Sequence, residues 1–117
     1  MFKIGIIGRG EELYNSVINL IDRGFDVAFI VTAKEAPEYK YNTEDFKVLA
    51  REHSIPFLHN PKVDRDKLQD LIGQTSVDIC VSINYSGIIS SEVIELFPLG
   101  ILNLHGGDLP RYRGNAC

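Results

Sequence analysis

Short apolar runs alternate with helix-patterned segments along this chain, and that alternation constrains its fold more than any other feature. Runs of buried character bounded by Gly, Pro or polar clusters predict strands, and apolar residues three or four positions apart predict helices. The predicted strands cover residues 2–7, 25–31, 55–58, 77–83 and 101–105. The predicted helices cover residues 11–23, 43–53, 64–72 and 92–97, with Thr43, Asp64 and either Ser90 or Ser91 at their starts.

A strand–helix repeat of this kind calls for a mostly parallel sheet with helices on both of its faces. Right-handed crossovers make the expected α/β fold Rossmann-like. The segment at 55–58 contains Pro56, which favours an edge position in that sheet. Ligands of such sheets bind beyond the carboxyl ends of the strands, so functional residues are expected after Ile7, Val31, Ile83 and Leu104.

Composition narrows the possible functions. The 117 residues are 44% apolar and 24% charged, which is typical of one globular domain. The chain has neither an apolar run of roughly 18 residues nor a signal-peptide pattern, so we expect a cytoplasmic location and no membrane partner. A net charge of −4 without a basic block argues against nucleic acid as the main partner. Cys80 and Cys117 form no metal-binding or disulfide pattern, so no metal is expected and Cys80 is interpreted as a buried free thiol.

A glycine-rich turn follows the first predicted strand. Gly8, Arg9 and Gly10 begin a G-x-G pattern, but Leu13 stands where a dinucleotide fingerprint has its third glycine. The second strand also ends without the acidic residue that would bind a ribose hydroxyl. Two other interpretations stay open: a small anion bound at the helix N-terminus beside Arg9, or a tight turn that simply needs glycine.

Two polar residues occupy the end of the last predicted strand. Side chains alternate along a strand, so Asn103 and His105 share one face. A strand buried on both faces is apolar throughout, and this departure falls at the ligand-binding end of the sheet. Histidine can move a proton near neutral pH and an Asn amide can stabilise a developing oxyanion, a combination suited to acyl transfer. Two structural alternatives are a buried amide that bonds a neighbouring loop and a hydrogen-bonded strand end.

A family resemblance rests on residues 103–114, Asn-Leu-His-Gly-Gly-Asp-Leu-Pro-Arg-Tyr-Arg-Gly. This segment resembles the N-x-H-G-S-L-L-P-x-x-R-G signature of the 10-formyltetrahydrofolate-dependent formyltransferases. Upstream, residues 82–89 are similar to the A-Y-G-x-I-L segment that lines the folate pocket of that family. The resemblance runs along the whole chain and implies that residues 1–117 are the N-terminal portion of a formyltransferase catalytic domain.

The resemblance implies roles for individual residues. Asn103 and His105 would be catalytic, with His105 in proton transfer and Asn103 at the formyl oxygen. The formyl donor, 10-formyltetrahydrofolate, would contact Ile83, Asn84, Tyr85, Ser86, Gly87, Ile88 and Ile89. The amine substrate would contact Gly8, Arg9, Gly10, Gly106, Gly107, Asp108 and Arg113. Residues 83–89 can also be interpreted as a plain strand-to-helix loop, and Arg113 as a solvated charge.

One departure from the signature bears on the substrate. Gly107 and Asp108 replace the Ser-Leu pair of S-L-L-P and resemble what sugar N-formyltransferases carry. We therefore expect formyl transfer to the primary amine of a nucleotide-linked amino sugar, with a small-molecule partner and no nucleic acid. The alternatives are a methionyl-tRNA or other amine formyltransferase, a formyltetrahydrofolate hydrolase, and a non-catalytic nucleotide-binding module.

A second departure is the family's third catalytic residue, an Asp, which we expect beyond Cys117. The remaining strands of the sheet are expected there too, so the fold should be incomplete in this chain. On this interpretation residues 1–117 alone are inactive, and a homodimer could form through the C-terminal part.

Overall fold

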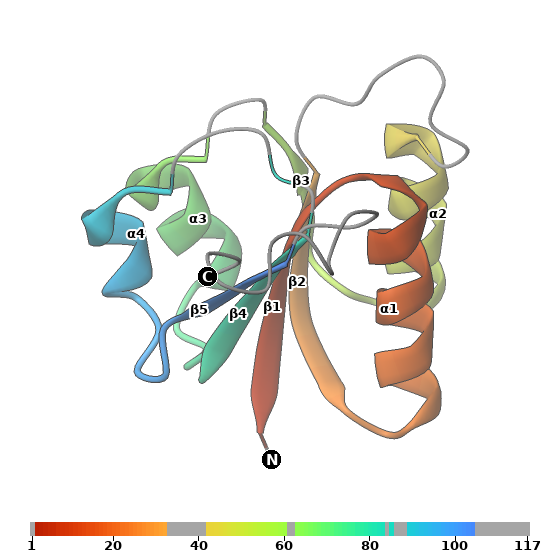
Figure 1. The fold of residues 1–117 in the computed structure, drawn as a ribbon, viewed down its shortest axis with the longest axis horizontal. Helices are drawn as coiled ribbons and strands as arrows, with labels where there is room; N and C mark the ends of the chain where they lie inside the picture. The colour runs from red at the N-terminus through yellow and green to blue at the C-terminus, as the bar shows by residue number, and fades with distance from the viewer. Residues whose placement is uncertain (1, 33–41, 61–62, 84, 86–88, 105–117) are drawn as a thin grey trace, which may run out of the picture.

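A parallel sheet with the strand order β3-β2-β1-β4-β5 forms the centre of the molecule (Figure 1). The computed structural model describes residues 2–32, 42–60, 63–83, 85 and 89–104. The strands are β1 (Lys3–Gly8), β2 (Asp26–Thr32), β3 (Phe57–His59), β4 (Ile79–Ile83) and β5 (Ile101–Leu104). Each neighbouring pair runs parallel. The predicted Rossmann-like α/β fold is confirmed.

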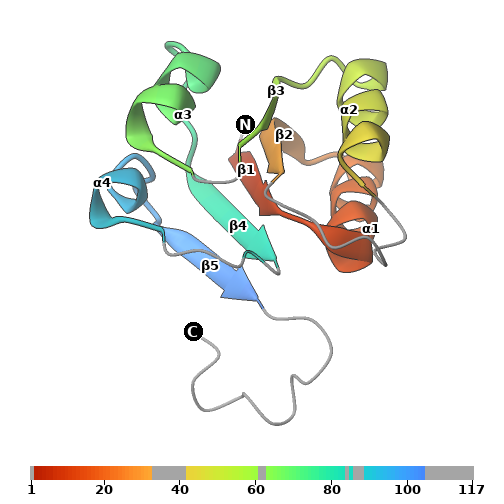
Figure 2. The same cartoon turned by 90° about the horizontal axis from the view of Figure 1, so that it is seen from above.

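Helices cover both faces of the sheet, as predicted (Figure 2). They are α1 (Gly10–Asp22), α2 (Thr43–Glu52), α3 (Arg65–Ile72) and α4 (Ser91–Ile94). Both ribbon views place α1 and α2 on one face and α3 and α4 on the other. Within the described ranges, no helix combines the length and the apolar character that crossing a bilayer requires.

Each face of the sheet has its own apolar cluster. Side chains of β1 and β4 alternate between the two clusters, as the pleat of a strand requires. The cluster under α1 and α2 contains Ile4, Ile6, Leu13, Val17, Val27, Ile30, Phe46, Leu49, Ala50 and Ile83. The cluster under α3 and α4 contains Ile7, Phe29, Val31, Val63, Leu68, Val77, Cys80, Tyr85, Val93 and Phe97. Cys80 is free and buried, which confirms its interpretation as a buried free thiol, and burial raises the pKa of that thiol.

Local capping sets where three of the helices begin. Asp64 and Ser90 accept hydrogen bonds from the first turns of α3 and α4, at 2.8 and 3.3 Å. Both caps are as predicted. The helix α2 begins at Thr43, as predicted, and the residue that caps it is Asn42. Asn42 and Asp45 form a reciprocal capping box in which the Asp45 carboxylate accepts from the Asn42 amide at 2.9 Å.

Three predicted elements differ from the structure by two residues or more at one end. Pro56 precedes β3 instead of lying in it, and its carbonyl accepts from the Ile30 amide at 2.9 Å. The edge position of that strand is confirmed. The strand predicted at 77–83 begins at Ile79. The helix predicted at 92–97 is the single turn α4, because the amides of Leu96 and Phe97 bond three residues back instead of four.

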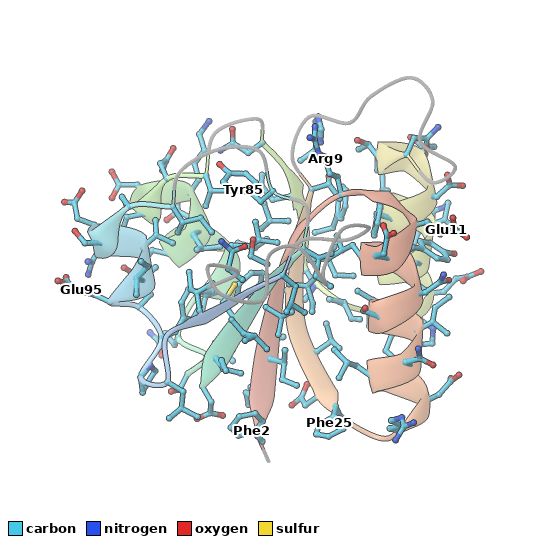
Figure 3. The ribbon with its side chains drawn as sticks, viewed as in Figure 1. Phe2, Arg9, Glu11, Phe25, Tyr85 and Glu95 are labelled. Atoms are coloured by element: carbon cyan, nitrogen blue, oxygen red, sulfur yellow. The ribbon has the colours of Figure 1, made fainter. Side chains whose placement is uncertain are left out.

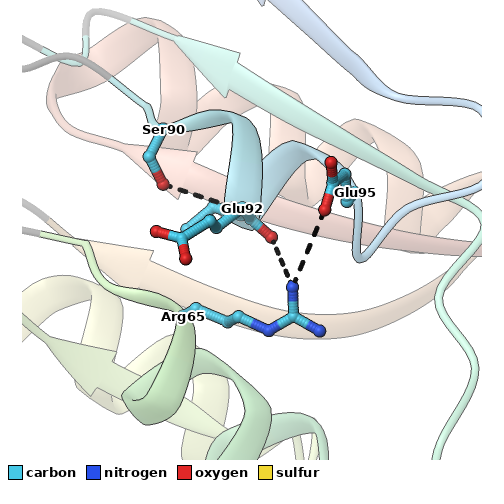
Figure 4. Close-up of polar contacts among 5 residues, drawn as sticks. Arg65, Ser90, Glu92 and Glu95 are labelled. Atoms are coloured by element: carbon cyan, nitrogen blue, oxygen red, sulfur yellow. Dashed lines mark hydrogen bonds and ion pairs between the residues drawn. The ribbon is translucent and has the colours of Figure 1, made fainter.

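The two helices on one face meet through Arg65 of α3 (Figure 4). Its Nη1 donates to the carbonyl oxygen of Glu92 at 3.2 Å and lies 4.0 Å from the carboxylate of Glu95. Both charged side chains of that ion pair are exposed, so solvent screens their attraction and the pair contributes little to stability. The packing of α3 and α4 is stabilised mainly by the burial of Leu68 and Val93 in the same apolar cluster.

Candidate functional site

The strand order reverses between β1 and β4, and in sheets of this kind ligands bind at the carboxyl end of that reversal. Gly8 ends β1 beside Ile83, the last residue of β4. The amide of Arg9 donates to the Ile83 carbonyl oxygen at 3.2 Å. Figure 3 shows Arg9 and Tyr85 at this end of the molecule, opposite Phe2 and Phe25. The ends of β1 and β4 are thus held together at the ligand-binding end of the sheet.

Gly8 has a structural reason to be glycine. Its φ is +149°, and a Cβ built on it would clash with the carbonyl oxygen of Ile83. Close approach of the two backbones therefore excludes a side chain at this position. This geometry accounts for the first glycine of the turn whatever ligand binds.

The start of α1 carries acidic residues. Gly10 is its first residue and is buried, and Glu11 and Glu12 lie in its first turn. Carboxylates at this end stabilise the helix dipole but repel an incoming anion. The local charge does not favour the anion site that the sequence left open beside Arg9.

Asn103 is exposed in the structure, and this corrects one premise of the sequence interpretation. We expected the last strand to be buried on both faces, but β5 lies at the edge of the described sheet and Leu102 is 50% exposed. Polar residues are common in edge strands, so the polarity of Asn103 alone does not indicate a functional role. Its exposure does leave the Asn103 carboxamide accessible at the carboxyl end of the sheet.

The residues after β5 fall outside the described part of the chain. His105, predicted to be catalytic, is among them, and so are the predicted substrate contacts Gly106, Gly107, Asp108 and Arg113. Their roles stay predictions.

Three residues of the predicted folate segment are described, and their side chains face the core. Ile83 is 4% exposed and belongs to the cluster under α1 and α2. Tyr85 is buried in the opposite cluster, and Ile89 packs against that cluster. The Tyr85 hydroxyl accepts from the Val63 amide at 3.2 Å, which ties the segment after β4 to the chain that follows β3. The other predicted donor contacts, Asn84, Ser86, Gly87 and Ile88, lie outside the described residues.

The sequence interpretation missed Ser82, which stands directly beside Asn103. The two residues are register partners on β4 and β5. Ser82 is fully buried, and its Oγ makes no hydrogen bond with any residue that the structure describes. A serine within the otherwise apolar run Ile-Cys-Val-Ser-Ile was the available signal.

A second polar group lies at the carboxyl ends of β2 and β3. The Nδ1 of His59 is 2.9 Å from the Thr32 hydroxyl and 3.1 Å from the Thr43 hydroxyl. Thr32 and His59 end β2 and β3 in register, so only knowledge of strand pairing could have joined them. Across the described residues, no three potential metal ligands of the His, Cys, Asp or Glu type come together.

Comparison with known proteins shows the family. The model of the family described as "Formyl transferase" matches residues 2–117. The chain belongs to the formyl transferase family. The family match confirms the enzyme class expected from the sequence, a formyltransferase. The expected donor, 10-formyltetrahydrofolate, agrees with that class.

Curated relatives of this family carry the name methionyl-tRNA formyltransferase. The protein of Ruminiclostridium cellulolyticum is 32% identical over 97% of the chain, and that of Desulforamulus reducens is 32% identical over 97%. The protein of Geobacter metallireducens is 34% identical over 86%. The matched regions span 38%, 37% and 33% of these relatives, so the chain corresponds to well under half of their length.

The predicted partner, a small nucleotide-sugar amine with nucleic acid excluded, is contradicted by these relatives, whose names specify a tRNA. The inference of a sugar substrate from Gly107 and Asp108 was therefore wrong. The charge argument failed for a physical reason. A net charge of −4 on 117 residues says nothing about charges elsewhere in proteins of which the match covers 38% or less.

Proposed function

We propose that the full-length protein transfers a formyl group from 10-formyltetrahydrofolate to the amino group of methionyl-tRNA, and that residues 1–117 are the N-terminal part of its catalytic domain. The observation that carries the reaction class is the family match over residues 2–117. The names of the relatives support the acceptor. The site supports the reaction through Asn103, an accessible carboxamide at the ligand-binding end of the sheet.

The described residues fit a formyl donor bound at the carboxyl ends of β4 and β5. When bound, 10-formyltetrahydrofolate supplies the formyl carbon. Ile83, Tyr85 and Ile89 are held by the two core clusters, so their side chains anchor the segment after β4. Recognition of the donor would then fall to backbone groups and to the intervening residues of segment 83–89.

Asn103 and His105 would divide the chemistry between them. The side-chain N–H of Asn103 would donate to the formyl oxygen as negative charge grows on it in the transition state. His105 would accept the proton that the attacking amine loses and return it to the nitrogen that leaves the formyl carbon. Asn103 lies within β5, where the strand limits the freedom of its backbone.

The direct test uses the full-length protein, 10-formyltetrahydrofolate and initiator tRNA charged with methionine. We expect formyl-methionyl-tRNA to accumulate, and we expect none with uncharged tRNA. Transfer to a small amine but not to methionyl-tRNA would overturn the acceptor. Release of formate without any acceptor would favour a hydrolase instead.

A further inference from the structure

Tyr85 carries a hydroxyl at a position where packing alone requires only an aromatic ring. Its side chain is 9% exposed and belongs to the apolar cluster under α3 and α4, to which Phe29 and Phe97 contribute rings without a hydroxyl. Burial of a hydroxyl is unfavourable unless it makes a hydrogen bond, so phenylalanine would fill the same space at a lower cost. The hydroxyl of Tyr85 is therefore best explained by the bond that it makes.

That bond joins two connections at the carboxyl end of the sheet. The Tyr85 hydroxyl accepts from the backbone amide of Val63 at 3.2 Å, and the bond is buried. Val63 is 7% exposed and lies between β3 and α3, whereas Tyr85 lies between β4 and α4. Both connections follow the carboxyl ends of parallel strands, where ligands of such folds bind.

The position of Val63 is fixed by bonds on either side of it. The Asn60 amide donates to the Thr32 carbonyl oxygen at 2.9 Å, which holds the end of β3 to the end of β2. The Asp64 carboxylate accepts from the Lys67 amide at 2.8 Å and so caps α3. The Val63 amide therefore lies between two anchored positions, and a group bonded to it is held to both.

We propose that Tyr85 is a positioning residue for the formyl donor. Its hydroxyl holds segment 83–89 in the conformation that binds 10-formyltetrahydrofolate, and other groups of that segment contact the donor. When the bond is lost, part of the protein leaves this conformation, and the apparent affinity for the donor falls by the fraction that remains. The proposal rests on the proposed function, which assigns the donor to this segment.

The coupling can be tested without turnover, because linkage is reciprocal. If the bond favours donor binding, the bound donor must strengthen the bond by the same factor. The probe is 5-formyltetrahydrofolate, an isomer of the donor with the formyl group on another nitrogen. In the full-length protein we expect saturating probe to slow hydrogen exchange of the Val63 amide about three- to tenfold, the factor for one ordinary hydrogen bond.

An amide at the other end of β3 is the control for that exchange experiment. The Ile55 amide donates to the Ala50 carbonyl oxygen at 2.8 Å, before β3 begins. It reports any general stabilisation of the fold by the bound probe. Equal slowing at Ile55 and Val63 would overturn the proposal, as would an unchanged rate at Val63.

Two variants separate this role from a contribution to stability alone. Tyr85→Phe keeps the ring and removes only the hydroxyl, and we expect it to raise the Kd of the probe about three- to tenfold. Phe97→Leu is the matched control, because Phe97 is a buried aromatic residue of the same cluster and follows α4. It should lower the melting temperature and leave the Kd unchanged. An unchanged Kd in Tyr85→Phe, or equal changes in both variants, would contradict the proposal.

Kinetics divide the effect between binding and chemistry. With 10-formyltetrahydrofolate and methionyl-tRNA, Tyr85→Phe should raise the KM for the donor by the same factor and leave kcat and the KM for the acceptor at wild-type values. A lower kcat with an unchanged donor KM would exclude a role in donor binding.

Failure of this proposal and failure of the proposed function give different results. If the wild-type protein binds the probe but transfers no formyl group, the proposed function is wrong, and the Kd of Tyr85→Phe still decides whether Tyr85 positions the segment for a folate. If the wild-type protein does not bind the probe, the role of Tyr85 is itself overturned.

Discussion

Gly8 packs directly against the backbone carbonyl of Ile83, which leaves no space for a side chain between β1 and β4. This contact joins the two strands at which the sheet order reverses, and the Arg9 amide reinforces it with a hydrogen bond to the same carbonyl. The geometry of the proposed site depends on it, since a spread of these strand ends would move everything that follows β4.

Gly8→Ala should therefore be severely destabilising. A Cβ would clash with backbone and would also occupy an unfavourable positive φ, so we expect a loss of about 3 kcal/mol or more in the free energy of unfolding. Gly24→Ala is the matched control, because Gly24 also has a positive φ but open space around its α-carbon. Its cost should be about 1 kcal/mol. Denaturant titration of the two variants makes the comparison; equal losses would mean that strain alone, not the close approach, matters at Gly8.

Gly5 makes room for an aromatic ring. A Cβ at Gly5 would overlap the ring of Phe29, which is fully buried on the neighbouring strand. We expect Gly5→Ala to cost about 1–3 kcal/mol through overpacking. Phe29→Leu frees that space, so the double variant should lose less than the sum of the single losses. A strictly additive cycle in thermal or denaturant unfolding would show that the ring is not the obstacle.

The capping box at the start of α2 predicts a modest effect. Asn42→Ala removes the side chain that accepts from the Glu44 and Asp45 amides at 3.0 and 3.2 Å. The expected loss in the free energy of unfolding is about 1 kcal/mol. Asn42→Ser retains a capping oxygen and should stay close to the wild-type value. If Ser and Ala proved equally harmful, the cap would not be the source of the effect.

His59 should stabilise the fold through its contacts with two threonines. Thr32 is 1% exposed, so its hydroxyl depends on protein partners such as the His59 Nδ1 at 2.9 Å. We expect His59→Ala to cost about 1 kcal/mol because a buried hydroxyl loses a partner. Thr32→Val removes that hydroxyl and should recover part of the loss when combined with His59→Ala. Unfolding curves of the single and double variants measure the recovery, and its absence would assign the effect of His59 to other contacts.

The catalytic assignments predict large effects on turnover. In the full-length protein His105→Ala should lower kcat by about 10² or more, as loss of a general acid–base group does. Asn103→Ala should lower it by about 10²–10³, the range for removal of one oxyanion donor. Single-turnover rates with methionyl-tRNA and the folate donor measure both. Retention of the wild-type rate by either variant would exclude that residue from the chemistry.

Local signals were the ones that sequence reasoning could use. Asp64 and Ser90 cap the helices that the pattern assigned to them, because a cap acts within three residues of its own position. The same holds for Pro56, whose missing N–H predicted the edge location of β3. The fold class followed from the repeat of such local units.

Long-range pairing was beyond that reasoning. The burial of β5 was overestimated because its neighbours cannot be read from its own residues, as the 50% exposure of Leu102 shows. Ser82 was overlooked because its position beside Asn103 follows only from the register of β4 and β5. The acceptor was misjudged for a related reason: Gly107 and Asp108 were interpreted locally, whereas the relatives match across almost the whole chain.

The central position of β1 has a consequence for biosynthesis. The Lys3 amide donates to the carboxylate of Asp78 at 2.7 Å, across a separation of 75 residues. During synthesis β1 can pair early with β2, but its other edge must wait until β4 has been made. During that interval an apolar strand has an unpaired edge, which is the kind of surface that favours aggregation. Nascent chains that stop before β4 are therefore expected to need chaperone protection, and translation speed through residues 60–83 should affect the yield of folded protein.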